Sequence, residues 1–104
     1  MKLLTEQIKS KLPALGETEN ISCDDKEFVV KFFNPMGDWE WLVAEGEEQE
    51  DGDWMFFGLV DGFETEWGYF TLSGLEAVDV GLGLGIERDT CFGPIELHPE
   101  WAAM

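Results

Sequence analysis

The chain has 104 residues, of which 44% are hydrophobic and 13% aromatic, and its formal net charge at pH 7 is −17. This length indicates one domain, and the apolar content excludes a disordered acidic tail, which would be poor in aromatic residues. No apolar run reaches the ~18 residues of a membrane-spanning helix. The 23 acids against six bases have the wrong sign for direct binding to nucleic acid or to an anionic membrane. The chain turns polar at Thr5, before an apolar stretch of signal-peptide length, so we expect a cytoplasmic protein.

The acidic charge is concentrated in one part of the chain. Residues 1–31 carry five lysines and six acids, whereas residues 32–104 carry Arg88 and 17 acids, for a net charge of −16. Duplex DNA carries one charge per ~1.7 Å of axis, so sixteen charges correspond to about 27 Å of duplex. A domain of this length is about 30 Å across. The larger part of the chain therefore has a charge per unit length similar to that of DNA.

The first predicted element is a short helix over Thr5–Leu12. Thr5 is a suitable N-cap, and apolar residues recur on one face at i, i+4 spacing (Leu4, Ile8 and Leu12). Pro13 ends the helix. The segment from Pro13 to Lys26 has little periodicity and is predicted to be a loop.

Four strands follow, and short turns between them predict an antiparallel meander. Their expected ranges are Glu27–Phe33, Trp39–Glu45, Trp54–Val60 and Trp67–Leu72. The second strand alternates, with Trp39, Trp41 and Val43 on one face. The third is apolar on both faces, which is typical of a central strand.

The C-terminal part is predicted to add a helix and a last short strand. Ser73 and Glu76 match a capping box, which predicts a short helix near residues 74–79. The glycines of Gly81–Gly85 indicate a tight extended crossing, and Ile86–Asp89 a fifth strand. The tail is expected to pack through Phe92, Ile95, Leu97 and Trp101. The expected fold is a single α+β domain over residues 1–104, with a four- to five-stranded antiparallel meander sheet and two short helices.

Several kinds of chemistry find no support in the spacing of residues. The acidic loop Gly46–Asp53 lacks the twelfth-position glutamate of a calcium loop, although weak divalent-cation binding stays open. Cys23 and Cys91 fit no disulfide framework, and reduced thiols are expected in a cytoplasmic chain. His98 has no partner at zinc spacing. We expect no catalytic residues, no metal ion and no cofactor.

The candidate site is a set of acids at the turns of the meander. Turns alternate between the two ends of such a sheet, so one group should lie at each end. The candidate partner-binding residues are Glu45, Glu47, Glu48, Glu50, Asp51, Asp53, Asp61, Glu64 and Glu66. The ordinary explanation for the densest run, residues 45–53, is a solvated hairpin loop.

Several blocks in order resemble one known family. They are Val30–Pro35, Gly37–Trp41, Phe57–Gly62, Gly68–Ser73 and Gly83–Asp89, together with Leu3–Thr5 and Lys11–Leu15. Over about residues 3–93 the chain resembles the small bacterial domain-of-unknown-function 2958 family. The resemblance implies an accessory protein of plasmids and mobile elements, with no activity or site residues to carry over. Such a setting favours a role connected with defence systems.

Two functions are compatible with this charge. The first is a non-enzymatic acidic binding protein, a DNA mimic of the anti-restriction or anti-CRISPR type, that occupies the basic groove of a nuclease or defence complex. The alternative is a small structural or regulatory module of a mobile element whose acidity serves solubility or salt adaptation. A hydrolase with paired carboxylates is a weaker third hypothesis. An exposed end strand would leave pairing with a second copy open.

Overall fold

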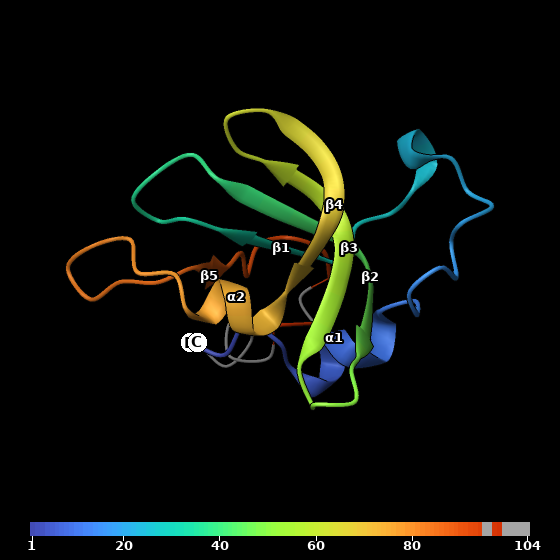
Figure 1. Cartoon of the computed structure of the whole chain (residues 1–104), viewed down its shortest axis with the longest axis horizontal. Coiled ribbons are helices and arrows are strands. Elements are labelled where there is room, and N and C mark those ends of the chain that lie inside the picture. The colour runs from blue at the N-terminus through green and yellow to red at the C-terminus, as the bar shows by residue number, and fades with distance from the viewer. Residues whose placement is uncertain (95–96, 99–104) are drawn as a thin grey trace.

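The chain folds into a five-stranded antiparallel sheet with strand order β4-β3-β2-β1-β5, accompanied by two short helices (Figure 1). The computed structural model describes residues 1–94, 97 and 98. The strands are β1 Val30–Phe33, β2 Glu40–Glu48, β3 Trp54–Asp61, β4 Thr65–Thr71 and β5 Glu87–Arg88. The predicted α+β class and meander are confirmed for β1 to β4. The fifth strand joins the opposite edge, beside β1.

The N-terminal helix α1, Glu6–Lys11, forms where the sequence predicts it. Thr5 is the N-cap, and its hydroxyl accepts a hydrogen bond from the backbone N–H of Ile8 at 3.3 Å. Glu6 and the lysines of the last turn complement the helix dipole. Ile8 is fully buried, so the helix packs its single apolar stripe onto the sheet.

The core lies between one face of the sheet and the two helices. Its fully buried hydrophobic residues are Ile8, Val30, Phe32, Val43 and Phe56. The ring centroids of Phe32 and Phe56 lie 5.9 Å apart. Leu3, Leu4, Leu75, Ile86 and Leu97 complete the cluster. Of the tail residues predicted to pack, Leu97 is buried in the core and Phe92 is half-buried, whereas Ile95 and Trp101 lie outside the described residues.

Strand β2 contains a bulge that the alternating pattern did not predict. Val43 pairs with Gly58 and Glu45 pairs with Phe57, so Ala44 is the extra residue between them. The bulge reverses the alternation and turns Glu45 to the face opposite Val43. The strand continues to Glu48, so the first three residues of the predicted acidic loop Gly46–Asp53 are strand.

The second face of the sheet is covered by the segment that leads from α1 to β1. Residues 13–26 form a loop, as predicted, except for the 3-10 turn η1, Cys23–Asp25. The strand predicted over Glu27–Phe33 begins only at Val30, so residues 27–29 belong to this loop. At its end Phe28 stacks on Trp67 of β4, which stacks in turn on Phe57 of β3, with both centroid distances at 5.6 Å. These rings attach the loop to the sheet.

The second helix, α2, differs from its predicted form. It spans Leu72–Glu76, and its N-cap is Thr71, whose hydroxyl accepts from the backbone N–H of Gly74 at 3.0 Å. The predicted capping box is therefore wrong. The Ser73 hydroxyl instead donates to Asp53, which precedes β3, and the helix starts directly at the end of β4.

The glycine-rich segment is a tight turn rather than the expected extended crossing. Gly81 and Leu84 form an isolated antiparallel bridge. Leu82 and Gly83 at its tip both have positive φ angles, 58° and 75°, which is the geometry of a two-residue hairpin turn. Glycine removes the steric cost of this turn at Gly83.

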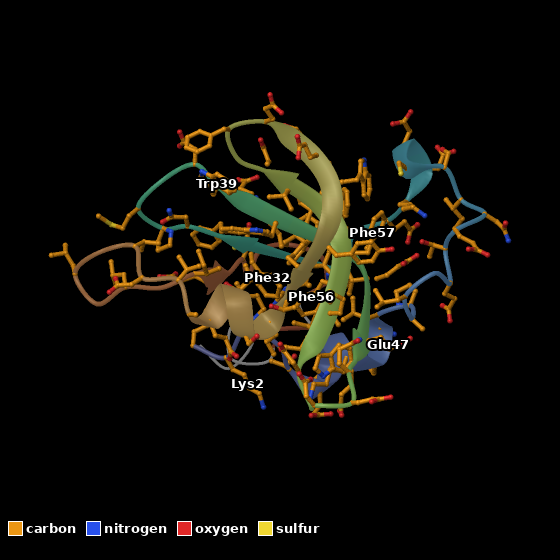
Figure 2. All side chains as sticks on the ribbon, viewed as in Figure 1. Lys2, Phe32, Trp39, Glu47, Phe56 and Phe57 are labelled. Atoms are coloured by element: carbon orange, nitrogen blue, oxygen red, sulfur yellow. The ribbon has the colours of Figure 1, made fainter. Side chains whose placement is uncertain are left out.

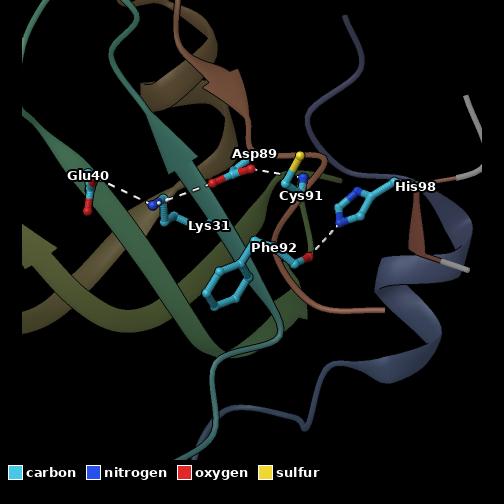
Figure 3. Close-up of polar contacts among 6 residues, drawn as sticks. All are labelled: Lys31, Glu40, Asp89, Cys91, Phe92 and His98. Carbon is cyan, nitrogen blue, oxygen red and sulfur yellow. Dashed lines mark hydrogen bonds and ion pairs between the residues drawn. The ribbon is translucent and has the colours of Figure 1, made fainter. Parts of the chain in front are cut away.

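The tail returns to the sheet through a buried polar contact. The Arg88 guanidinium is 3% exposed, donates to the carbonyl of Leu97 at 3.3 Å, and lies 3.1 Å from His98 Nδ1. His98 Nε2 lies 2.7 Å from the carbonyl oxygen of Phe92 (Figure 3). Together with the Arg88 contact at Nδ1, this holds the ring on both sides. The contact at Phe92 requires the proton on Nε2, which leaves Nδ1 to accept from Arg88.

Candidate acidic interface

The structure separates the candidate carboxylates into two structural residues and two exposed groups. Glu45 is 3% exposed and lies under the loop from α1 to β1. Asp53 binds the start of α2. The other candidates reach solvent at the two turns of β3, as the meander predicted.

Glu45 holds the covering loop onto the sheet. Its carboxylate accepts from the backbone N–H groups of Gly16 at 2.8 Å and Thr18 at 3.0 Å, and from the Thr18 hydroxyl. The Lys26 ammonium donates to the Thr18 hydroxyl at 2.8 Å and extends the network. Burial raises the pKa of Glu45, but these hydrogen bonds and the charge of Lys26 outweigh it, so the pKa lies below its ordinary value of 4.5. Glu45 is therefore removed from the surface that a partner could contact.

Asp53 joins the β2–β3 turn to α2. Its carboxylate accepts from the Ser73 hydroxyl at 2.5 Å, the Ser73 N–H at 3.1 Å and the Trp54 N–H at 2.8 Å. The Ser73 hydroxyl is the main cause that lowers the pKa of Asp53. Burial opposes it, and the backbone N–H groups of Trp54 and Ser73 each lower the pKa by a smaller amount. The sequence predicted Asp53 as a partner-binding residue and did not indicate its structural role.

We expect Asp53→Asn to lower the free energy of unfolding, because an amide cannot accept from all these donors. In a Ser73→Ala background the same substitution should have a clearly smaller effect, since its principal partner is gone. Because the pKa is depressed, the contribution is present above the ordinary value of 3.8 and is lost as the pH falls through the folded-state pKa. Urea unfolding of the four proteins of this cycle at pH 7 and pH 3 measures both effects. Equal losses in the two backgrounds would show that Asp53 does not act through Ser73, and Glu50→Gln is the exposed control.

We call the first exposed group the loop-end acids: Glu47, Glu48, Glu50 and Asp51. They surround the turn between β2 and β3, where Gly52 supplies a positive φ of 86°. Helix α1 lies near this end, and the ammonium of Lys9 lies 5.5 Å from the ring centroid of Trp54, the first residue of β3. A basic side chain is therefore close to these carboxylates.

We call the second group the turn-end acids: Asp61, Glu64 and Glu66 at the β3–β4 turn, with Asp38 on the neighbouring β1–β2 turn. Figure 2 shows Trp39 at this end of the sheet and Glu47 toward the other. Asp61 is half-buried and accepts from the Thr65 hydroxyl at 3.0 Å, whereas Asp38, Glu64 and Glu66 are exposed. Among the described residues, none of the ion pairs reaches either group.

Several basic side chains are held by contacts within the chain. Arg88 is buried, and Lys26 is bound to Thr18. Lys31 lies between two carboxylates, 3.5 Å from Glu40 and 3.4 Å from Asp89 (Figure 3). The remaining lysines, Lys2, Lys9 and Lys11, are all in the N-terminal segment around α1. Within the described part of the chain, none of the ion pairs neutralises a turn-end acid.

The turn end also carries two aromatic residues, Trp39 and Phe63, that the sequence did not indicate as a pair. Phe63 is 95% exposed at the tip of the β3–β4 turn. Its ring meets Trp39 at a centroid distance of 5.4 Å and an angle of 84°. No local signal in the sequence indicates this pair. In the fold, a Cβ at Gly62 would lie 2.5 Å from the Trp39 ring, so the glycine lets that ring lie against the turn.

Metal and thiol chemistry gain no support from the described residues. Within residues 1–94, 97 and 98, no three His, Cys, Asp or Glu side chains cluster closely enough to hold a metal ion. Cys23 and Cys91 are exposed and are not joined in a disulfide. None of the described helices is long and apolar enough to cross a membrane.

These features define a small acidic α+β protein whose charge is exposed at both ends of an antiparallel sheet. A family model described as "Protein of unknown function (DUF2958)" matches residues 3–104, so the chain belongs to this family. The match confirms the resemblance seen in the sequence and extends it to the end of the chain. No curated protein and no solved structure matches the chain.

Proposed function

We propose that this protein is a non-enzymatic acidic binding protein that occupies the basic groove of a nucleic-acid-binding protein in place of DNA. The observation that carries the proposal is the separation of charge. The turn-end acids and loop-end acids reach solvent, while Arg88, Lys26 and Lys31 are held within the fold. A protein that used its acids only to pair its own lysines would not leave these groups exposed.

The dimensions of the molecule agree with mimicry of a short duplex. Its principal extents are 41 × 34 × 30 Å, and the −16 charges of residues 32–104 equal those of about 27 Å of DNA. Lysine and arginine side chains that hold phosphates would meet the exposed carboxylates of the turn-end and loop-end groups. Long-range attraction would make association fast at low salt and much slower as salt rises.

The turn end has the composition of a contact surface. Trp39 and Phe63 provide apolar area at its centre, and the carboxylates form a charged rim. Aromatic residues surrounded by polar groups are typical of the energetic centre of protein interfaces. The loop-end acids, which lie beside the lysines of α1, then contribute mainly to steering. In the setting of a mobile element, the groove would belong to a restriction enzyme or a CRISPR effector nuclease.

Two variants with the same change in net charge test this assignment. The turn-end variant is D38N/E64Q/E66Q and the loop-end variant is E47Q/E48Q/E50Q. We expect the turn-end variant to weaken binding to the target nuclease about tenfold or more through faster dissociation, because each contacting pair contributes up to ~1 kcal/mol. The loop-end variant should mainly slow association. Surface plasmon resonance at low and physiological salt separates the two rates.

Unfolding in urea provides the control for both variants, because all six positions are exposed and stability should change little. Equal losses of affinity, all in the association rate, would contradict a contact surface at the turn end. Such a result would mean that these residues act only through the net charge of the protein and make no direct contact with the partner.

A further inference from the structure

A pocket opens on the sheet at the β3–β4 turn. It is lined by Trp39, Val60, Phe63, Glu64 and Glu66, and its volume is about 350 Å³. Ligand pockets in proteins range from ~300 to ~1,000 Å³, so this one suits a single side chain better than a nucleotide or a large cofactor. Its lining thus combines three apolar side chains with two carboxylates.

The Trp39 ring is positioned by its packing against the turn and against β2. Trp39 lies directly against Gly62, where any Cβ would overlap three atoms of its ring at 2.5–2.6 Å. On another side it packs against Trp41, with centroids 5.9 Å apart. Phe63 stands almost perpendicular to Trp39, at 84°, with its ring open to solvent. An aromatic ring left this exposed is a usual anchor for a partner.

The charge of the two carboxylates selects the kind of occupant. Glu64 immediately precedes β4 and Glu66 lies within it, opposite Val60 in the β3–β4 pairing. None of the ion pairs in the described part of the chain involves Glu64 or Glu66. An anionic or a purely apolar occupant would leave two carboxylates near its surface without compensation, whereas a cation would be attracted to both the carboxylates and the faces of the rings.

We infer that this pocket receives an arginine side chain of the partner protein. The inference rests on the proposed function, and it names the contact that would distinguish this surface from a plain polyanion. A guanidinium is planar, stacks on tryptophan and donates two parallel hydrogen bonds to a carboxylate. An ammonium is more strongly hydrated and lacks the planar shape, so lysine should bind more weakly in the same place.

Nuclear magnetic resonance with short peptides tests the pocket without any partner protein. The probes are acetyl-Gly-Arg-Gly-amide, its lysine analogue and its citrulline analogue, which keeps the shape of arginine without the charge. The signal is the indole N–H of Trp39, assigned by its loss in Trp39→Phe. We expect saturable shifts with the arginine peptide, several-fold weaker binding of the lysine peptide, and no binding of the citrulline peptide.

Variants locate the binding. E64Q/E66Q and Phe63→Ala should each weaken the arginine peptide about threefold to tenfold, and the matched control E47Q/E48Q should not. Shifts of equal size with citrulline, equal affinity for lysine, or equal shifts at the loop-end acids would each overturn the inference. Failure here with intact displacement of DNA from a nuclease would reject the pocket alone. Binding of the peptide without any such displacement would reject the proposed function instead.

Discussion

Gly58→Ala should destabilise the fold by about 3 kcal/mol, the upper part of the range for overpacking. Gly58 lies in the middle of β3, opposite Val43 and next to the bulge of β2. A Cβ there would lie 1.9 Å from the carbonyl oxygen of Leu42 and 3.0 Å from Cα of Val43. These are backbone atoms, so no side-chain rotation can relieve the overlap, and β2 and β3 would have to separate. Urea unfolding monitored by tryptophan fluorescence measures the loss.

Gly68 is the matched control for this substitution. It pairs with Gly58 across β3 and β4, but a Cβ at Gly68 meets no atom within 4 Å. We therefore expect Gly68→Ala to change stability by no more than about 0.5 kcal/mol, the range of a substitution that touches nothing. Similar effects at the two positions would contradict the close approach of β2 to β3.

Glu45→Gln should cost about 2 kcal/mol at pH 7, which is typical of a lost hydrogen-bond set to a buried charge. The amide nitrogen would face N–H donors of Gly16 or Thr18, so at least one donor would lose its partner. The loop over the second face of the sheet should then become accessible to protease. Unfolding in urea together with limited proteolysis between residues 13 and 28 measures both effects, and Glu47→Gln, at an exposed position, is the control.

The same variant should lose its disadvantage in acid. Because the pKa of Glu45 is lowered on folding, its carboxylate stabilises the protein above the ordinary value of 4.5, and this contribution falls as the pH drops through the folded-state pKa. The difference between wild type and Glu45→Gln should thus be constant from pH 8 to pH 6 and shrink below the ordinary value. A difference that grows in acid would mean that the carboxylate is destabilising.

Local signals in the sequence located most elements of the fold. Thr5 and Ile8 define α1 by a cap and a buried stripe, which depend on neighbours within one turn. The aromatic run of β3 indicated a strand with partners on both sides, as found. The predictions that were wrong depend on contacts from distant parts of the chain. Ser73 was predicted to cap α2, but its hydroxyl donates to Asp53, which lies 20 residues earlier in the chain.

The sequence predicted which acids lie at each end of the sheet, but it did not predict which of them are exposed or which aromatic residues lie beside them. The positions of the meander turns placed Glu47 and Glu64 at opposite ends of the sheet without any knowledge of tertiary contacts. The bulge at Ala44 is invisible to a period-2 pattern, so nothing indicated that Glu45 would be buried. Trp39 and Phe63 are far apart in the sequence and meet only because β2 and β3 pair in this register.

Salt adaptation makes a different prediction from mimicry. If the acids served only that purpose, molar salt would strongly stabilise the fold by screening the repulsion, and no partner would bind at low salt. Mimicry requires a fold that is already stable at low salt, where binding is strongest. Thermal unfolding across a salt series distinguishes a modest gain from a strong dependence.

The central claim is that this fold presents its carboxylates to a groove that holds DNA. The most direct measurement is equilibrium competition at low salt, with fluorescent duplex DNA bound to a restriction endonuclease or to a CRISPR effector nuclease. Unstructured polyglutamate at the same total charge is the comparison. We expect the folded protein to displace DNA from one of these enzymes at concentrations where polyglutamate does not, and the D38N/E64Q/E66Q variant to lose most of this ability. Displacement from neither enzyme, or displacement no better than that by polyglutamate, would contradict the claim.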